Sequence, residues 1–120
     1  MREIIFYRTE SDKCPVKEFL DSLNGRQAQK VVWVLKLIEE LIAVPKQYFK
    51  KLIDSDELWE IRVQFEGNIF RILGFFDGRN VLILNHGFRK KSQKTPQREI
   101  ELSKQRKKDY FRSKHRERFE

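Results

Sequence analysis

Three strand-like runs separated by two short turns set the strongest limit on the fold of this chain. The runs read ELWEIRVQF, IFRILGFFD and NVLILNHGF, and the turns contain Gly67 and Gly78. Val, Ile and aromatic residues favour strands, and a glycine at the first position of a two-residue loop favours a tight type II′ hairpin turn. The sequence therefore predicts an antiparallel three-stranded meander with loops at Gly67-Asn68 and Gly78-Arg79.

These loops predict which residues share a face of the sheet, because a two-residue loop fixes the register and side chains alternate between faces. One face contains no charge and is expected to receive the helices; it carries Trp59, Ile61, Val63, Phe65, Phe70, Ile72, Gly74, Phe76, Val81 and Ile83. The opposite face divides along its length. Its apolar half carries Leu58, Leu73, Phe75, Leu82 and Leu84, and its polar half carries Arg62, Gln64, Arg71 and His86, with Phe88 just beyond. The apolar half needs a cover, either the last helix or a partner chain.

The remaining elements are predicted from apolar runs and the residues that end them. REIIFYR reads as a strand, Pro15 starts a helix through VKEFLDSL, and Asn24-Gly25 supplies its stop. A second helix follows over residues 26–43 and ends before Pro45, and the last helix starts at Thr95-Pro96.

This order of elements predicts an α+β fold with an N-terminal strand, a helical hairpin, a three-stranded antiparallel meander and a C-terminal helix. The length of 120 residues predicts a single domain spanning residues 1–120. Trp33, on the second helix, is assigned to the core together with Trp59.

The net charge of +8 is concentrated near the C-terminal end. Residues 1–85 hold 13 Lys or Arg and 13 Asp or Glu, whereas residues 86–120 hold 13 and 5. Such a basic block is typical of proteins that bind a nucleic acid or an anionic membrane, and also of solvated tails. No apolar run approaches the roughly 20 residues that span a bilayer, so no membrane partner is predicted. The single cysteine, Cys14, fits a reducing compartment, so a cytoplasmic protein is expected.

The polar half of the sheet suits phosphodiester cleavage. An RNA 2′-hydroxyl can attack its own phosphate when a base takes its proton and cations stabilise the charge on the phosphorane. We expect the catalytic residues to be Arg62, Arg71, His86 and Lys90. We expect contacts to RNA or the ribosome from Phe88, Arg89, Lys91 and Lys94. No Cys/His metal spacing or phosphate-binding glycine loop is found, so neither a metal nor a cofactor is predicted.

Each of these residues also has a plainer interpretation. His86 can be a strand-end histidine bonded to the backbone, and Phe88 can belong to the core. The two arginines can pair with Glu60 or Glu66 as surface salt bridges, which contribute little to stability. The lysine run can be a solvated loop.

The segment from Leu58 to Tyr110 resembles the phage-derived branch of RelE/HigB-like toxins in the RelE/ParE superfamily. The resemblance lies in LWEIR, FRIL and HGFRKKSQKTP. It implies a type II toxin–antitoxin toxin that cleaves translated mRNA on the ribosome and is neutralised by a helix-turn-helix antitoxin. It transfers the family's basic site to Arg62, Arg71, Lys90 and Lys91, and less directly to His86 and Phe88. Some relatives carry a tyrosine near the C-terminus, for which this chain offers only Tyr110.

The resemblance leaves two other functions open. One is ParE-like inhibition of DNA gyrase by the same fold without catalysis. The other is a phage-derived module that binds nucleic acid and has neither catalytic activity nor toxicity.

Overall fold

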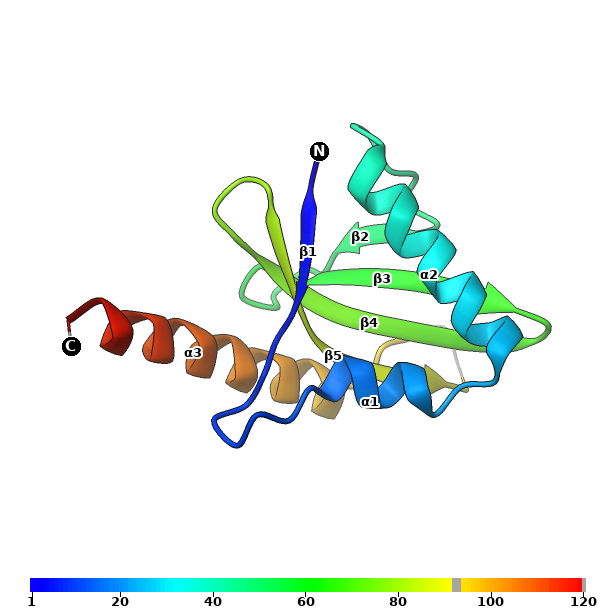
Figure 1. Cartoon of the computed structure of the whole chain (residues 1–120). Helices are drawn as coiled ribbons and strands as arrows, with labels where there is room; N and C mark the ends of the chain where they lie inside the picture. Colours follow the sequence, from blue (N-terminus) through cyan, green and yellow to red (C-terminus); the bar gives the residue numbers. More distant parts are fainter. Residues whose placement is uncertain (92–93, 120) are drawn as a thin grey trace.

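The structure is a computed structural model and describes residues 1–91 and 94–119. A five-stranded sheet in the order β1-β5-β4-β3-β2 forms its centre (Figure 1). The strands are β1 (Glu3–Phe6), β2 (Phe49–Lys51), β3 (Trp59–Phe65), β4 (Asn68–Asp77) and β5 (Val81–Lys90). The helices are α1 (Pro15–Asp21), α2 (Gly25–Glu40) and α3 (Gln97–Phe119). The α+β class and the antiparallel meander β3-β4-β5 are confirmed.

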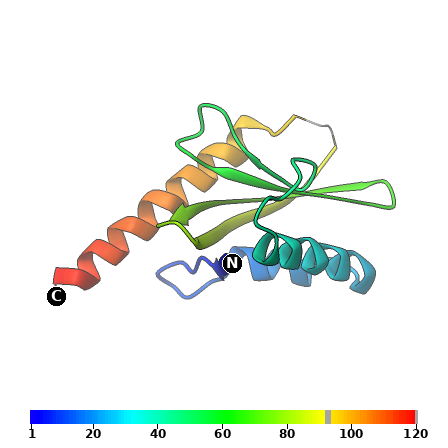
Figure 2. The same cartoon turned by 90° about the horizontal axis from the view of Figure 1, so that it is seen from above.

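The sheet separates two helical layers. Helices α1 and α2 lie on one side of it and α3 crosses the other side (Figure 2). The larger core lies under α1 and α2 and joins Val31, Val34 and Ile38 of α2 to the sheet. A smaller core lies under α3, where Ile100 and Tyr110 pack against a group that includes Leu58, Phe75 and Ile83. The last helix therefore covers the apolar half of the second face, which was one of the two covers expected.

The first hairpin turn differs from the predicted one by one position. Its loop is Glu66-Gly67, and both residues have positive φ, 50° and 81°, which is typical of a type I′ turn. Phe65 consequently faces Asn68, and Arg62 faces Arg71. Because this register differs from the predicted one by two residues, every side chain keeps its predicted face.

The second hairpin turn has three residues, Gly78 to Asn80, and the predicted two-residue loop is wrong. Asp77 pairs with Val81 and Phe76 pairs with Leu82. The extra residue exchanges the two faces of the first part of β5. Leu82 and Leu84 therefore belong to the core under α1 and α2, whereas Val81 and Ile83 belong to the core under α3, which reverses the prediction for all four.

An irregularity in the ladder then reverses this exchange. Gly74 pairs with Leu84, but Leu73 pairs with His86, so Asn85 is an extra residue opposite the Leu73/Gly74 step. A bulge of this kind shifts the following residues to the other face. His86 and Phe88 thereby return to the face of Arg71, as the sequence predicted.

Three further predictions are wrong. Asn24 does not end α1 but begins α2, because its side chain accepts a hydrogen bond from the Gln27 backbone N–H while the Gln27 side chain accepts one from Asn24. Such a reciprocal pair is a capping box. Helix α2 ends at Glu40, before the predicted residue 43. Trp33 is 47% exposed and packs on the surface against Tyr48 rather than in the core.

Two strand pairings add to the predicted meander. Strand β2 was not predicted, and it pairs antiparallel with β3 at the sheet edge. Strand β1 pairs in parallel with β5, so that Glu3 lies opposite Val81. Within the described residues no helix combines the length and apolar character needed to cross a membrane.

Gly74 is expected to be essential for this packing. A Cβ added there would clash with the Ile83 carbonyl oxygen, a backbone atom that cannot move aside as a flexible side chain could. We expect Gly74→Ala to destabilise the fold by roughly 1–3 kcal/mol, the range for overpacked cores. Urea unfolding measures the loss, and Gly25→Ala is the control because its Cβ would meet nothing within 4 Å. Equal midpoints for the two variants would contradict the bulge geometry.

Candidate functional site

The predicted site residues lie in two adjacent rows across three strands. Arg62, Arg71 and Phe88 are cross-strand neighbours in one row, and Glu60, Leu73 and His86 form the next. Neighbouring strands are about 4.8 Å apart, and residues two apart on a strand are about 6.7 Å apart. The two arginines and the histidine therefore share one face and one small area of the sheet.

A cluster of three cations around one carboxylate occupies this area. Glu60 Oε1 lies 3.4 Å from Arg71 Nε and 3.5 Å from Arg62 Nε. Its other oxygen accepts a hydrogen bond from the hydroxyl of Thr95, which in turn lies 3.5 Å from Lys90 Nζ. We call Glu60, Arg62, Arg71, Lys90 and Thr95 the basic cluster.

The basic cluster is mostly buried. The side chains of Arg71 and Glu60 are 1% and 5% exposed, whereas that of Arg62 is 27% exposed and forms the cluster's opening to solvent. The salt bridges expected at the surface are therefore present with Glu60, but inside the protein. Glu66 instead pairs with Arg26, at 2.7 Å.

Burial and repulsion between cations lower the pKa values of Arg71 and Lys90. Burial lowers the pKa of Arg71, although Glu60 opposes the change. Burial, and then the charge of Arg71, lower the pKa of Lys90. A lysine whose proton leaves more readily suits proton transfer better than an ordinary lysine. One carboxylate for three cations leaves a positive surplus, which an anionic ligand can neutralise.

His86 has both ring nitrogens engaged by α3. Arg106 Nη1 lies 3.3 Å from Nδ1, and Glu99 Oε2 lies 3.1 Å from Nε2. A guanidinium can only donate, so Nδ1 accepts and Nε2–H donates to Glu99, which defines a neutral tautomer. Burial lowers the pKa of His86 despite the contact with Glu99. In this arrangement the lone pair on Nδ1 is occupied by Arg106, so the imidazole cannot accept a proton from a substrate. Its two contacts hold α3 against the sheet.

We expect this buried histidine to make folding sensitive to mild acid. Its folded pKa lies below the ordinary value of 6.5, so as pH falls the unfolded chain binds the proton first. The stability contributed by neutral His86 is complete above pH 6.5 and is lost as pH falls toward the folded pKa. As the pH is lowered from 7, the urea midpoint of unfolding should fall in wild type and should fall less in His86→Gln.

A second group, Asp77, makes stability sensitive to acid in a separate pH range. Lys114, and then Tyr110, lower the pKa of Asp77 from 3.8. Its contribution is complete above pH 3.8 and is lost only as pH falls below that value. Parallel curves for wild type and His86→Gln between pH 6.5 and pH 4 would contradict the assignment to His86.

The predicted RNA-contact residues are not all on one face. Phe88 stacks on His86 with ring centroids 5.2 Å apart and lies beside Arg71. Arg89 lies on the other face, with its guanidinium 5.3 Å from the centre of the Phe70 ring. Lys91 and Lys94 are exposed on either side of residues 92–93, beside the cluster in sequence. The structure thus brings Phe88 to the cluster and separates Arg89 from it.

Tyr110 lies far from the cluster. Its hydroxyl donates to Asp77 Oδ2 at 2.7 Å, and its ring packs edge-on against Phe75. Burial and this hydrogen bond raise the pKa of Tyr110 to about 12. Asp77 is six residues along β4 from Arg71, roughly 20 Å away at strand spacing. Tyr110 fastens α3 to the sheet and is not placed to act as a base.

Four functional candidates were missed by the sequence reasoning: Glu60, Thr95, Glu99 and Arg106. Glu60 had a usable signal, because it precedes Arg62 by two residues and must share its face. Thr95 was predicted only as the start of the last helix, whereas its hydroxyl contacts Glu60. The two α3 residues required the placement of that helix.

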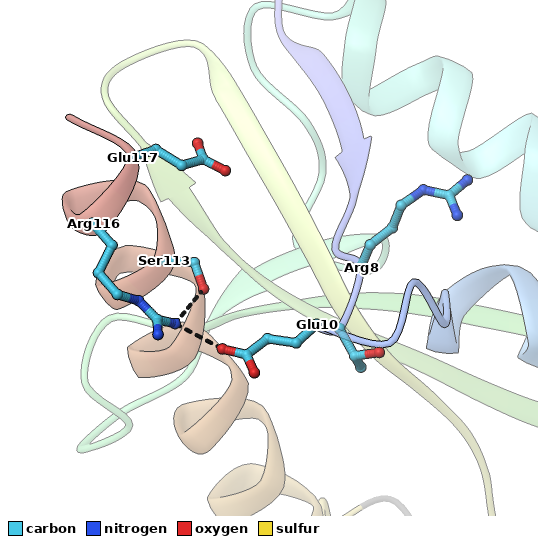
Figure 3. A pocket seen from close by; sticks show the side chains of 6 residues that line it. Arg8, Glu10, Ser113, Arg116 and Glu117 are labelled. Carbon is cyan, nitrogen blue, oxygen red and sulfur yellow. Dashed lines mark hydrogen bonds and ion pairs between the residues drawn. The ribbon is translucent and has the colours of Figure 1, made fainter. Parts of the chain in front are cut away.

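Another hollow, between the β1–α1 connection and the last turns of α3, has no such charge surplus (Figure 3). Two arginines and two glutamates line it, and Arg116 pairs with Glu10 at 2.7 Å. Among the described residues, no group of three or more His, Cys, Asp or Glu could hold a metal ion. The basic cluster is therefore the stronger candidate site.

Comparison with known families identifies the family of the chain. Residues 18–108 match the family described as Phage derived protein Gp49-like (DUF891), and the match includes all of the basic cluster. A comparison with curated proteins found no match. Because the match covers most of its length, the chain belongs to the phage-derived Gp49-like family, a RelE-like toxin family of toxin–antitoxin systems.

Proposed function

We propose that this protein is the toxin of a type II toxin–antitoxin pair and that it cleaves translated mRNA on the ribosome, as a RelE/HigB-like enzyme. The observation that carries the proposal is the basic cluster, in which two arginines pair with one carboxylate on the sheet and a lysine is linked to it through Thr95. Residues 1–120 act as one toxin domain. A cytoplasmic location and a helix-turn-helix antitoxin complete the proposal.

The cluster would act mainly by charge. Arg62, at the opening, would bind a nonbridging oxygen of the scissile phosphate, and Arg71 behind it would stabilise the charge that develops on the phosphorane. Lys90, whose pKa is lowered, would donate a proton to the leaving oxygen. Phe88 would stack on a neighbouring base.

In the proposed step the 2′-oxygen bonds to phosphorus as the bond to the leaving oxygen breaks, and the 2′-hydroxyl proton would pass to a water molecule at the opening of the cluster. Orientation of the 2′-hydroxyl then matters more than a strong base. His86 is engaged by Glu99 and Arg106 and is not placed to take the proton. Holding the attacking oxygen in line with the phosphate can itself supply much of the rate enhancement. The ribosome would provide this order, which explains why cleavage would depend on it.

Mapping mRNA 5′ ends after induction tests the proposal. Two reporter transcripts, identical except that one lacks a start codon, should differ: only the translated transcript should show cuts, spaced by codons. Cuts in both transcripts would show that cleavage does not depend on the ribosome. DNA damage without cuts would favour gyrase inhibition, and unaffected growth would favour the nucleic-acid-binding module.

The two neighbouring lysines are expected to differ in ribosome binding. Lys91 is exposed, so Lys91→Ala should reduce the slope of log affinity against log salt by about 0.7–0.9, the value for one phosphate contact. Lys90 is buried, so Lys90→Ala should change the slope less and the cleavage rate more. Ribosome pelleting across a salt series measures both slopes. An unchanged slope for Lys91→Ala would contradict a phosphate contact there.

A further inference from the structure

An apolar groove lies beyond the C-terminal end of α2, apart from the basic cluster. Its volume is about 620 Å³. Phe49, Trp59 and Phe76 contribute its aromatic side chains, and Ile42 and Ile53 are among its aliphatic ones. All the charged residues that line it are Lys or Arg.

The aromatic part of the groove is well packed. The Phe49 and Trp59 rings stack with centroids 4.6 Å apart, and Phe76 meets Trp59 edge-on at 5.7 Å. The guanidinium of Arg2 lies 5.8 Å from the Phe49 ring and donates to the carbonyl oxygens of Ile38 and Leu41. These contacts fix the end of α2 beside the rings, so the groove is formed before any ligand binds.

The rim combines exposed apolar and cationic side chains. Ile42 and Ile53 are 97% and 84% exposed. The side chains of Lys46, Lys50 and Arg79 make no hydrogen bond or ion pair with the residues that the structure describes. Lys50 lies on β2, the edge strand of the sheet. Exposed apolar groups beside unpaired charges of one sign mark an interaction surface.

We propose that this groove binds an acidic peptide segment of a protein partner that carries aliphatic side chains. Aliphatic groups of the segment would cover Ile42, Ile53 and the rings, and its carboxylates would neutralise Lys46, Lys50 and Arg79. A nucleic acid fits less well, because its backbone offers nothing apolar to Ile42 and Ile53. A second copy of this chain would bring the same positive charges together.

This proposal does not rest on the endonuclease activity. None of the residues that line the groove belongs to the basic cluster, and the two sites can be disrupted separately. Failure of one proposal would leave the other unaffected.

Selection of peptides tests the groove directly. A random peptide library displayed on phage is selected on the full chain and counter-selected on a Lys46→Glu/Lys50→Glu variant. We expect the enriched peptides to combine Asp or Glu with Leu, Ile or Val. Absence of enrichment, or enrichment of basic peptides, would overturn the proposal.

Affinity is then measured by the fluorescence of Trp59 in a Trp33→Phe background, where Trp59 is the only tryptophan. The charge-reversed variant and Ile42→Asp should each bind the enriched peptide about tenfold or more weakly than the unaltered groove does. Lys36→Glu, an exposed change on α2 outside the groove, should not. Equal affinities for all variants, or displacement of the peptide by a short RNA, would refute the proposal.

Discussion

Replacing Arg62 with alanine should reduce mRNA cleavage by on the order of 10²–10³ while leaving the fold intact. This is the loss measured when one preorganised donor to a developing oxyanion is removed. Arg62 is the most exposed cation of the cluster, with 27% of its side chain accessible, so it is the first to meet a phosphate. Its pairing with Glu60 at 3.5 Å is weak, and Glu60 keeps its contacts with Arg71 and Thr95.

Growth after induction, rates of 5′-end formation and thermal melting measure the effect of Arg62→Ala. The matched control is Arg26→Ala, which removes the same charge from α2 on the other side of the sheet. Arg26 and Glu66 are both exposed, and such pairs contribute about 0–1 kcal/mol. Full toxicity in a folded Arg62→Ala variant would remove the basis of the proposed site.

Replacing Arg71 with alanine should abolish cleavage and also destabilise the fold by about 3 kcal/mol. Arg71 is 1% exposed and is among the largest fully buried side chains of the molecule. Its Nη1 donates to the Phe70 carbonyl oxygen at 3.0 Å, and its Nε lies 3.4 Å from Glu60. Removing one partner of a buried ion pair typically costs 3–5 kcal/mol, but Arg62 still compensates Glu60 here.

A methionine at the same position separates charge from packing. Arg71→Met fills most of the volume that Arg71→Ala leaves empty, so it should recover most of the stability that Arg71→Ala loses. It should recover none of the cleavage, because no guanidinium remains behind Arg62. Urea unfolding and 5′-end mapping on both variants decide between the roles. Cleavage by Arg71→Met near the wild-type rate would show that Arg71 is structural only.

The shared face of Arg62, Arg71, His86 and Phe88 could be predicted, but the register that produces it could not. For the first hairpin, the predicted and observed pairings differ by two residues, which leaves the faces unchanged. For the second, a three-residue turn and the bulge at Asn85 each reverse the faces, and the two reversals cancel only at His86 and beyond. Leu82 and Ile83 lie between them, which is why their predicted faces were wrong.

Tertiary contacts decided the features that local patterns did not reveal. Strand β2 has only three residues, two of them lysines. It forms because its backbone pairs with the edge of β3. The tautomer of the buried His86 is set by Glu99 and Arg106, which the sequence places 13 and 20 positions away. Glu60 was visible in LWEIR, but its burial between two arginines required the placement of the segment around Thr95.

The parallel pairing of β1 with β5 has a consequence for synthesis. The first strand pairs with residues 81–84, in the last third of the chain, so the backbone groups that face β5 stay unpaired until those residues have left the ribosome. Long-range pairing of this kind slows folding and leaves early intermediates exposed. The sheet is therefore completed late in synthesis, only after β5 has emerged to pair with β1.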